Sequence, residues 1–163
     1  MSVRHIKHVP LTRCWILALA LLLPGWAHAA SYTFYWDGFL IFGEYTTNTP
    51  CIQNGSNIDW AYNSGTFRCA GAVVLKAGDT LQVNARYLNN ITVIADEGFV
   101  LSGNTIGTSG KNITLNSGYS PLTATGTNVI NGSVIATSGS ISLTDATVNG
   151  SVESQSGAIT LTN

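Results

Sequence analysis

Four acidic residues in the second half of the chain are the side chains best suited to acid–base chemistry: Asp96, Glu97, Asp145 and Glu153. Cleavage of a glycosidic bond needs two carboxylates about 5 to 10 Å apart that flank the bond. Asp96 and Glu97 precede Gly98, which predicts a turn. As neighbours in a strand they would point to opposite faces. The first two acids therefore do not predict a catalytic pair.

Residues 1–29 have the pattern of a secretory signal peptide. Three basic residues stand within positions 4–13, apolar residues fill 15–23, and alanines occupy positions 27 and 29. This pattern predicts cleavage after Ala29 and a secreted, cell-surface or periplasmic protein. A membrane anchor is the alternative, but it needs about 20 apolar residues, whereas this run has nine.

Removal of this segment limits the chemistry that remains. It contains all the histidines: His5, His8 and His28. Four basic and eight acidic residues are left, a net charge of −4, which is unlike a nucleic-acid binder. Without histidine, Ser-His-Asp catalysis and the usual zinc sites are excluded. The nonapeptide repeat that binds calcium does not occur either. We therefore expect no catalysis, no metal, no cofactor and no nucleic-acid partner.

Cys51 and Cys69 are the cysteines that remain after export. In an oxidising compartment a disulfide is the expected state of such a pair. It would stabilise the fold by about 3 kcal/mol. A metal or catalytic role for these two isolated cysteines is a weak alternative, because no histidine accompanies them.

Three aromatic residues are candidate contacts for a surface glycan: Trp60, Tyr62 and Tyr119. An aromatic ring can stack on the apolar face of a sugar. Aromatic residues in the first part of the chain have a core role as their alternative, because they bury much area. Tyr119 lies near Pro121 in an irregular stretch, which favours exposure.

The elements that must position these side chains form two parts that differ in composition. Residues 30–90 hold both cysteines and most aromatics, and the alternation along 32–37 predicts a strand with an aromatic face. Residues 72–75 and 80–83 predict two more strands. We expect a small disulfide-linked β cap unit over residues 30–90, followed by a β-solenoid over 91–163.

An 18-residue repeat is the basis for the solenoid. Segments 130–145 and 148–163 are identical at nine of sixteen positions. A fainter copy spans 93–106, and residues 118–126 look irregular. Short β-branched segments with Asn-Gly turns predict an all-β fold with 18-residue coils. Antiparallel hairpins in a sandwich are the alternative.

Stacked copies would form a continuous apolar core. The expected vertical pairs are Val134 with Val152, Ile141 with Ile159, and Leu143 with Leu161. Asn131 over Asn149 would form an amide ladder inside a turn, and Gly132 and Gly150 would supply positive φ. Ser142 over Thr160 and Thr144 over Thr162 would make a flat hydroxyl face.

The same alignment of the repeats places no acid beside Asp145 or Glu153. It places Asn163 beside Asp145 and Ile135 beside Glu153, so neither acid has a carboxylate partner. The sequence stops at Asn163, inside a repeat and without a polar cap. This predicts either that the natural chain continues or that the open edge docks another molecule, a second copy first of all.

Two resemblances follow from these motifs. The coil pattern of residues 130–163 resembles the short-coil solenoids of bactofilins, which polymerise end to end. A signal peptide, Cys51, Phe67-Arg68-Cys69, the G-D-T-L turn at 78–81 and the repeats together resemble the N-terminal region of exported bacterial proteins described as mannose-sensitive haemagglutinin (MSHA) pilus biogenesis protein Q. Those proteins are far longer. The resemblance implies a surface or pilus-associated protein and supplies no catalytic residue.

The sequence thus predicts an exported structural or adhesive β-solenoid segment of a cell-surface or pilus-associated protein. A carbohydrate-binding or carbohydrate-cleaving β-helix protein is one alternative, and a self-assembling extracellular fibre module is another. The expected partners are a surface glycan, pilus or surface proteins, or a second copy at the open solenoid edge.

Overall fold

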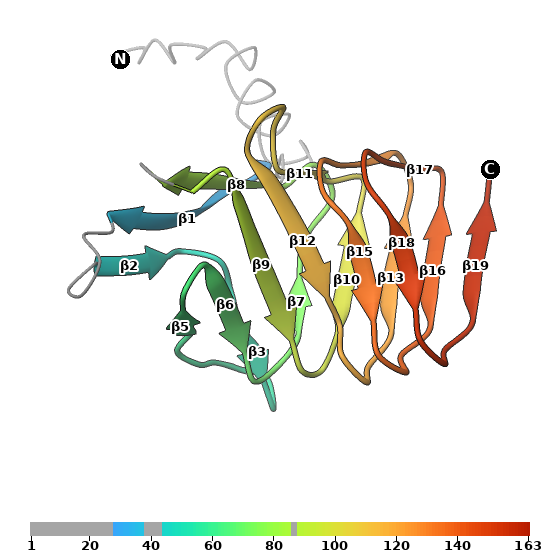
Figure 1. Cartoon of the computed structure of the whole chain (residues 1–163), viewed down its shortest axis with the longest axis horizontal. Helices are drawn as coiled ribbons and strands as arrows, with labels where there is room; N and C mark the ends of the chain where they lie inside the picture. Colours follow the sequence, from blue (N-terminus) through green and yellow to red (C-terminus); the bar gives the residue numbers. More distant parts are fainter. Residues whose placement is uncertain (1–27, 38–43, 86–87) are drawn as a thin grey trace, which may run out of the picture.

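The computed structural model describes residues 28–37, 44–85 and 88–163, and every regular element in these ranges is a β-strand. Almost all of the expected signal peptide lies outside the described residues. The strands stack side by side along one axis that leads to β19 (Figure 1). Within the described ranges, no helix is long and apolar enough to span a membrane.

Three sheets form the walls of this stack. The β8 sheet has the order β17 (Ala146–Val148), β14 (Asn128–Ile130), β11 (Thr105–Ile106), β8 (Thr80–Ala85), β1 (Ser31–Asp37) and β2 (Glu44–Thr47). The β10 sheet has the order β19 (Ile159–Thr162), β16 (Ile141–Thr144), β13 (Leu122–Thr125), β10 (Phe99–Ser102) and β7 (Val73–Val74). The β9 sheet has the order β18 (Val152–Ser154), β15 (Val134–Ala136), β12 (Asn112–Asn116), β9 (Asn90–Ala95), β6 (Thr66–Cys69) and β5 (Ala61–Asn63).

Successive strands belong to successive sheets, so three strands make one coil. The coils are β6–β7–β8, β9–β10–β11, β12–β13–β14 and β15–β16–β17, followed by β18 and β19. Strands of neighbouring coils pair in parallel in every sheet. This confirms the all-β solenoid and excludes the sandwich, in which hairpin-connected neighbours would run antiparallel.

The predicted register of the last two coils is confirmed. The three apolar pairs occur as expected: Val134 with Val152, Ile141 with Ile159, and Leu143 with Leu161. The side-chain amide of Asn149 donates a hydrogen bond to Oδ1 of Asn131 at 3.0 Å, which forms the predicted ladder.

Coil length falls along the chain. One column of the β10 sheet shows this, because each pairing step covers fewer residues than the step before it. The steps lead from Val73 to Phe99, then to Leu122, Ile141 and Ile159. The extra residues of the early coils lie in the turns, because the paired strands remain in register.

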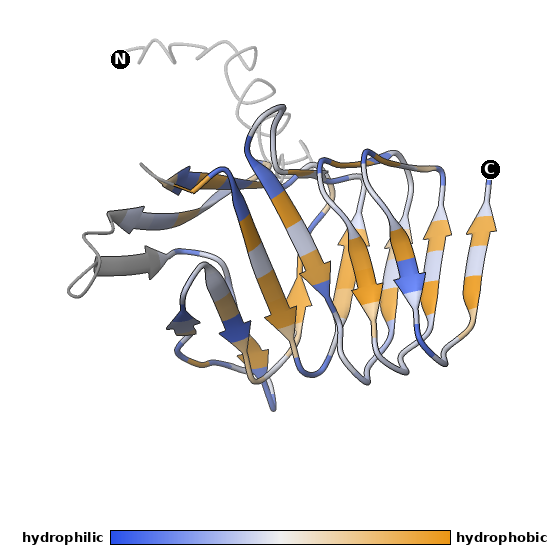
Figure 2. Ribbon diagram, viewed as in Figure 1, coloured by the Kyte–Doolittle hydropathy of each residue, from blue (hydrophilic) through white to orange (hydrophobic). Residues whose placement is uncertain are grey.

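Along most strands of the stack apolar and polar residues alternate (Figure 2), and the apolar ones are buried and form its core. Leu81, Ile106 and Ile130 are vertically paired in the β8 sheet and fully buried. Val93, Leu115 and Val134 form the matching column of the β9 sheet and are also fully buried. Each coil is too small to bury these side chains alone, so the core exists only when coils are stacked.

Gly132 and Gly150 differ from the expectation in part. Gly132 has φ 144°, as predicted, but Gly150 is not among the glycines with positive φ. The prediction for Gly150 is wrong, because glycine is needed there for lack of space rather than for a positive φ. A Cβ atom on Gly150 would overlap the carbonyl group of Gly132 in the coil before it. Glycine at this position permits close stacking of backbones rather than a left-handed turn.

The N-terminal cap, comprising β1, β2, β3 (Ile52–Gln53), β4 (Ser56–Asn57) and β5, covers the first coil. β1 runs parallel to β8 and antiparallel to β2, and β5 runs antiparallel to β6. Ile52 bridges Ala72 beside β7. The first coil, residues 66–85, therefore lies inside the range that composition assigned to a separate unit. The parallel stack begins at β6, well before residue 90.

Candidate functional site

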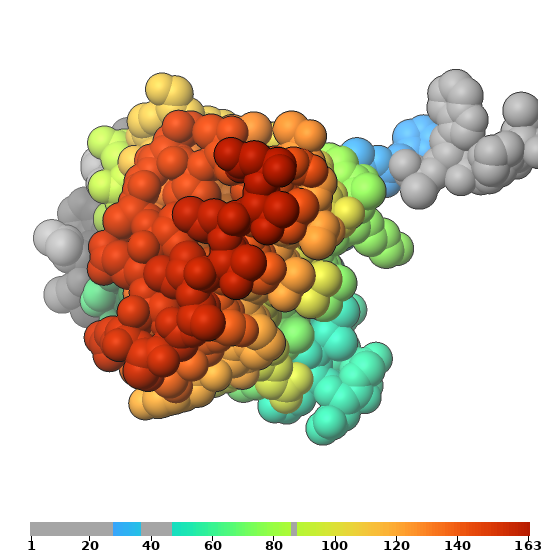
Figure 3. All heavy atoms as spheres, turned by 90° about the vertical axis from the view of Figure 1, so that its right-hand side faces the viewer, coloured from blue at the N-terminus to red at the C-terminus, as the bar shows by residue number. Residues whose placement is uncertain are grey.

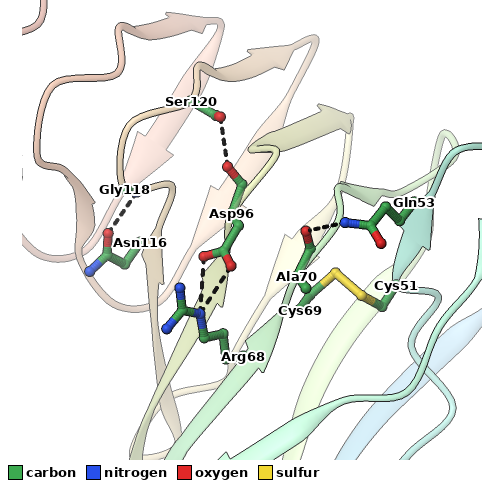
Figure 4. A network of polar contacts seen from close by, with 9 residues as sticks. All are labelled: Cys51, Gln53, Arg68, Cys69, Ala70, Asp96, Asn116, Gly118 and Ser120. Carbon is green, nitrogen blue, oxygen red and sulfur yellow. Dashed lines mark hydrogen bonds and ion pairs between the residues drawn. A yellow bond between two sulfur atoms is a disulfide. The ribbon is translucent and has the colours of Figure 1, made fainter.

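The Cys51–Cys69 disulfide anchors the cap to the first coil. The S–S distance is 2.02 Å, and both cysteines are buried. Next to it, Gln53 donates its side-chain amide hydrogen to the carbonyl oxygen of Ala70 at 3.1 Å (Figure 4). The segment after Cys51 is thus tied both to β6, which contains Cys69, and to the residue that follows this strand.

Trp60 and Tyr62, two of the candidate glycan contacts, are half-buried in the aromatic part of the core. Trp60 meets Phe34 edge to face at 5.1 Å between ring centroids, and its indole N–H donates to the carbonyl oxygen of Thr49 at 2.8 Å. Tyr62 packs on Trp36 and Phe67, and its hydroxyl accepts a hydrogen bond from the Gly65 N–H. Their positions are fixed by packing.

A cleft of about 530 Å³ opens beside Trp60. Its lining residues come from two segments of the cap that the disulfide holds near β6: Thr47, Asn48, Thr49, Pro50, Cys51, Asn57, Ile58, Asp59 and Trp60. Tyr62 and Tyr119 do not line it. Of the three aromatic candidates, Trp60 is the one that lines this cleft, and clefts are where ligands most often bind.

The polar groups of this cleft are of two kinds. Asn48 accepts from the Thr33 N–H and donates to the Ser31 carbonyl oxygen, so its amide holds β1 in place. Asn57 and Asp59 are exposed, and their side chains make no hydrogen bond to other described residues. An amide and a carboxylate next to an aromatic ring can bind hydroxyl groups while the ring contacts an apolar face.

Tyr119 lies in the turn between β12 and β13 and is 79% exposed. Nearby in this turn, Gly118 N–H donates to Oδ1 of Asn116 at 2.9 Å (Figure 4). The exposure expected from the sequence is confirmed for Tyr119. It stands alone on a convex turn, however, and is separate from the cleft that contains Trp60.

Of the acidic candidates, Asp96 pairs with a basic residue and Glu153 lies opposite an apolar one. Asp96 accepts two hydrogen bonds from Arg68 Nε at 3.0 and 3.1 Å, and its backbone oxygen accepts from the Ser120 hydroxyl at 2.7 Å (Figure 4). Glu153 is opposite Ile135, as the repeat predicted. No group of three or more potential metal ligands occurs among the described residues.

A column of buried polar residues follows one corner of the stack and was not found by sequence analysis. Asp79, Asn104 and Asn128 are 2%, 1% and 0% exposed. The Asn104 amide donates to the Asp79 carbonyl oxygen at 3.1 Å, and the Asn104 N–H donates to Oδ1 of Asn128 at 2.9 Å. The signal for this column was the recurrence of G-D-T-L at 78–81 as G-N-T-I at 103–106.

Outward-facing positions of the β10 sheet form the hydroxyl rows expected from the repeat. Ser142 pairs with Thr160, and Thr144 pairs with Thr162. Thr123 extends the first row by pairing with both Ser142 and Val100. The sheet thus presents a neutral surface of hydroxyl groups on its later coils.

The last coil has the same inward positions as the coils before it, but they are more exposed. Ile159 is 42% and Leu161 65% exposed, whereas Ile141 and Leu143 beneath them are 0% and 4% exposed. Figure 3 views this coil end-on and shows residues of its strands spread across the face. These apolar side chains supply the surface that a further coil would cover.

The geometry supports a rigid stack with a polar wall and one polar cleft at its capped end. Comparison of the chain with protein-family models, with curated proteins and with solved structures finds no match. The resemblances stated for the repeats and for the G-D-T-L turn therefore remain expectations.

Proposed function

We propose that this chain is an exported structural or adhesive β-solenoid segment of a cell-surface or pilus-associated protein and has no catalysis of its own. The observation that carries the proposal is the parallel stack itself. Its last coils place the same residue types over one another, for example Val134 with Val152 and Ile141 with Ile159. Such a stack is a rod that holds what lies at its ends at a fixed separation.

The disulfide and the predicted signal peptide support the location. A disulfide that joins buried cysteines is typical of proteins that fold in an oxidising compartment. The hydroxyl rows on the β10 sheet support a structural or adhesive role. The resemblance to MSHA pilus biogenesis protein Q adds a pilus-associated setting to the proposal.

The first experiment is the intact mass, the N-terminal residue and the compartment of the native product under non-reducing conditions. We expect a product that begins at Ala30, lacks two hydrogens because of the disulfide, and is digested by protease added to intact or outer-membrane-permeabilised cells. A cytoplasmic product with an intact leader and two free thiols would overturn the proposal. A much larger product with the same start would identify this chain as the base of a longer rod.

Carbohydrate binding in the Trp60 cleft is a second candidate, and the juxtaposition of Asp59, Asn57 and Trp60 favours it. Titration with neutral oligosaccharides such as cellotriose and N,N′,N″-triacetylchitotriose would quench the Trp60 fluorescence. Asp59→Ala and Asn57→Ala should each weaken binding at least tenfold, whereas Asp145→Ala, an exposed acid on a distant coil, should not change it. Equal affinity in all four proteins, or no binding of any probe, contradicts this candidate.

A further inference from the structure

The backbone nitrogen of Ala30 points at a buried carboxylate. It lies 2.7 Å from Oδ1 of Asp79, whose side chain belongs to a residue that is only 2% exposed. The other oxygen, Oδ2, accepts from the Lys76 N–H at 2.8 Å. Ala30 is 49 residues before Asp79, so this contact joins the start of the folded chain to the corner column of the solenoid.

The neighbouring contacts fix Ala30 in this place. The Thr80 N–H donates to the Ala30 carbonyl oxygen at 2.9 Å, and Ser31 pairs with Thr80 where β1 joins β8. His28 and Ala29, in contrast, are exposed. The chain therefore enters the fold at Ala30, and the peptide bond before it lies at the boundary between the exposed and the ordered chain.

Ala30 is also the first residue after the cleavage position that the sequence predicts. Hydrolysis of the Ala29–Ala30 bond transfers a hydroxyl group from water to the Ala29 carbonyl carbon and a hydrogen to the Ala30 nitrogen. The amine so formed takes up a proton from solvent and is mostly an ammonium at neutral pH. The donor to Asp79 then changes from an uncharged amide to a cation without moving.

We propose that cleavage of the Ala29–Ala30 bond creates an α-ammonium group that pairs with the buried Asp79 carboxylate, so that processing of the leader strengthens the fold. The inference rests on the proposed export of the chain. Before cleavage, the recorded side-chain contacts of Asp79 within the described residues are two neutral N–H donors. A buried charge without a counter-charge is costly, and a charge-assisted hydrogen bond to an ammonium removes much of that cost.

The pair also reaches into the following coils. The side-chain amide of Asn104 donates to the carbonyl oxygens of both Lys76 and Asp79, at 2.7 and 3.1 Å. The backbone N–H of Asn104 donates to Oδ1 of Asn128. The new terminus thus holds Asp79 in place, and Asp79 is the first residue of a hydrogen-bonded column that runs through three coils. Stabilisation by processing should extend beyond the cap to β8 and β11.

A four-protein cycle tests the proposal. The mature chain is prepared with a free Ala30 amine or with an acetylated Ala30, each with Asp79 or with Asp79→Asn. Acetylation keeps the N–H donor and removes only the positive charge. We expect it to lower the unfolding midpoint of the Asp79 protein by about 5 °C and to leave the Asp79→Asn protein almost unchanged. Asp59→Asn, an exposed acid of the cap, serves as the control and should respond to acetylation as the parent does.

Equal effects of acetylation in the Asp79 and Asp79→Asn proteins overturn the ion pair. If Asp79→Asn does not fold, amide hydrogen exchange decides the question in the parent sequence alone. Protection of β8 and β11 must then be greater with the free amine than with the acetyl group, and equal protection overturns the proposal. N-terminal sequencing of the exported product distinguishes a failure of this inference from a failure of the proposed function. Export with a start other than Ala30 contradicts this inference but leaves the proposed function intact.

Discussion

The N-terminal cap and the later coils bury their apolar side chains by different means. At the capped end, the rings of Phe34, Trp60 and Tyr62 from the cap and of Phe67 from the first coil pack against one another, with centroids 4.6 to 5.1 Å apart, beside a disulfide. In the coils from β12 onward, the buried apolar side chains are aliphatic, and glycines at the corners bring successive backbones close together.

This difference shows that the two regions meet different geometric demands. The cap closes an irregular end, so large rings and a cross-link fill spaces that no repeat defines. The coils stack on copies of themselves, so the backbone of the neighbouring coil limits the size of the side chain at each corner position. Gly139 is an example, because a Cβ atom there would overlap the carbonyl oxygen of Ser120. The four predictions below test this contrast, from the largest effect to the smallest.

Gly139→Val should give the largest loss. The added side chain must displace the backbone of the neighbouring coil at Ser120, which we expect to destabilise the fold by about 3 kcal/mol or more. Urea unfolding followed by far-UV circular dichroism measures it. Ser140→Val places the same side chain on the next, exposed residue and should change stability by less than about 0.5 kcal/mol. Similar losses in both variants would show that close backbone stacking does not govern this corner.

Replacing Cys51 and Cys69 by alanine should cost about 3 kcal/mol, because the closed loop restrains the unfolded chain. The loss should be uneven if the cap and the coils are held by separate means. Hydrogen exchange should become faster in β1, β5 and β6 and stay slow in β13 and β16. Uniformly faster exchange in all sheets would mean that the cap and the coils unfold as one unit.

Asn131→Ala should cost about 1 kcal/mol. Its amide donates to the carbonyl oxygens of Ile106 and Gly107, at 3.3 Å each, and its Oδ1 accepts from Asn149. Asn149→Ala removes only the last of these bonds, at an exposed position, and should cost less. Comparing the two urea midpoints checks the order, and a larger loss for Asn149→Ala would contradict the ladder as described.

Arg68→Ala should have the smallest effect. The ion pair between Arg68 and Asp96 links β6 to the end of β9, but the two side chains are 61% and 33% exposed. Exposed pairs contribute less than about 1 kcal/mol, and salt screens them. The difference between the variant and the parent should shrink further at high ionic strength. A loss as large as that of the disulfide variant would mean that this contact joins the first coil to the second as firmly as the disulfide joins the cap to the first coil.

The sequence predicted the fold where the coils repeat and missed it where they do not. The pairs Val134 with Val152 and Ile141 with Ile159 could be predicted from equal spacing, and the strand β1 from the alternation along 32–37. Residues 118–126 looked irregular, yet they contain β13. Extra turn residues shift the spacing there, so strands remain in register in space while the period changes along the chain.

The candidate site was predicted less well than the fold. The disulfide between Cys51 and Cys69 was predicted because only two cysteines remain after the expected export and an oxidising compartment favours their pairing. Trp60 was identified as a residue type, but the cleft beside it depends on segments brought together by the disulfide, which sequence spacing does not encode. The contact between Ala30 and Asp79 was out of reach for the same reason, since a parallel strand pair separated by 49 residues creates it.

The last pairing step has the same length in all three sheets, from Asn128 to Ala146, from Val134 to Val152 and from Ile141 to Ile159, and this has a genetic consequence. Where the step is equal in every sheet, an added copy presents the same surface to the next. An in-frame duplication of the DNA for one coil would therefore lengthen the rod by one strand spacing, about 4.8 Å, and leave the cap unaltered. The length of the stack is thus a quantity that selection can adjust in small, equal steps.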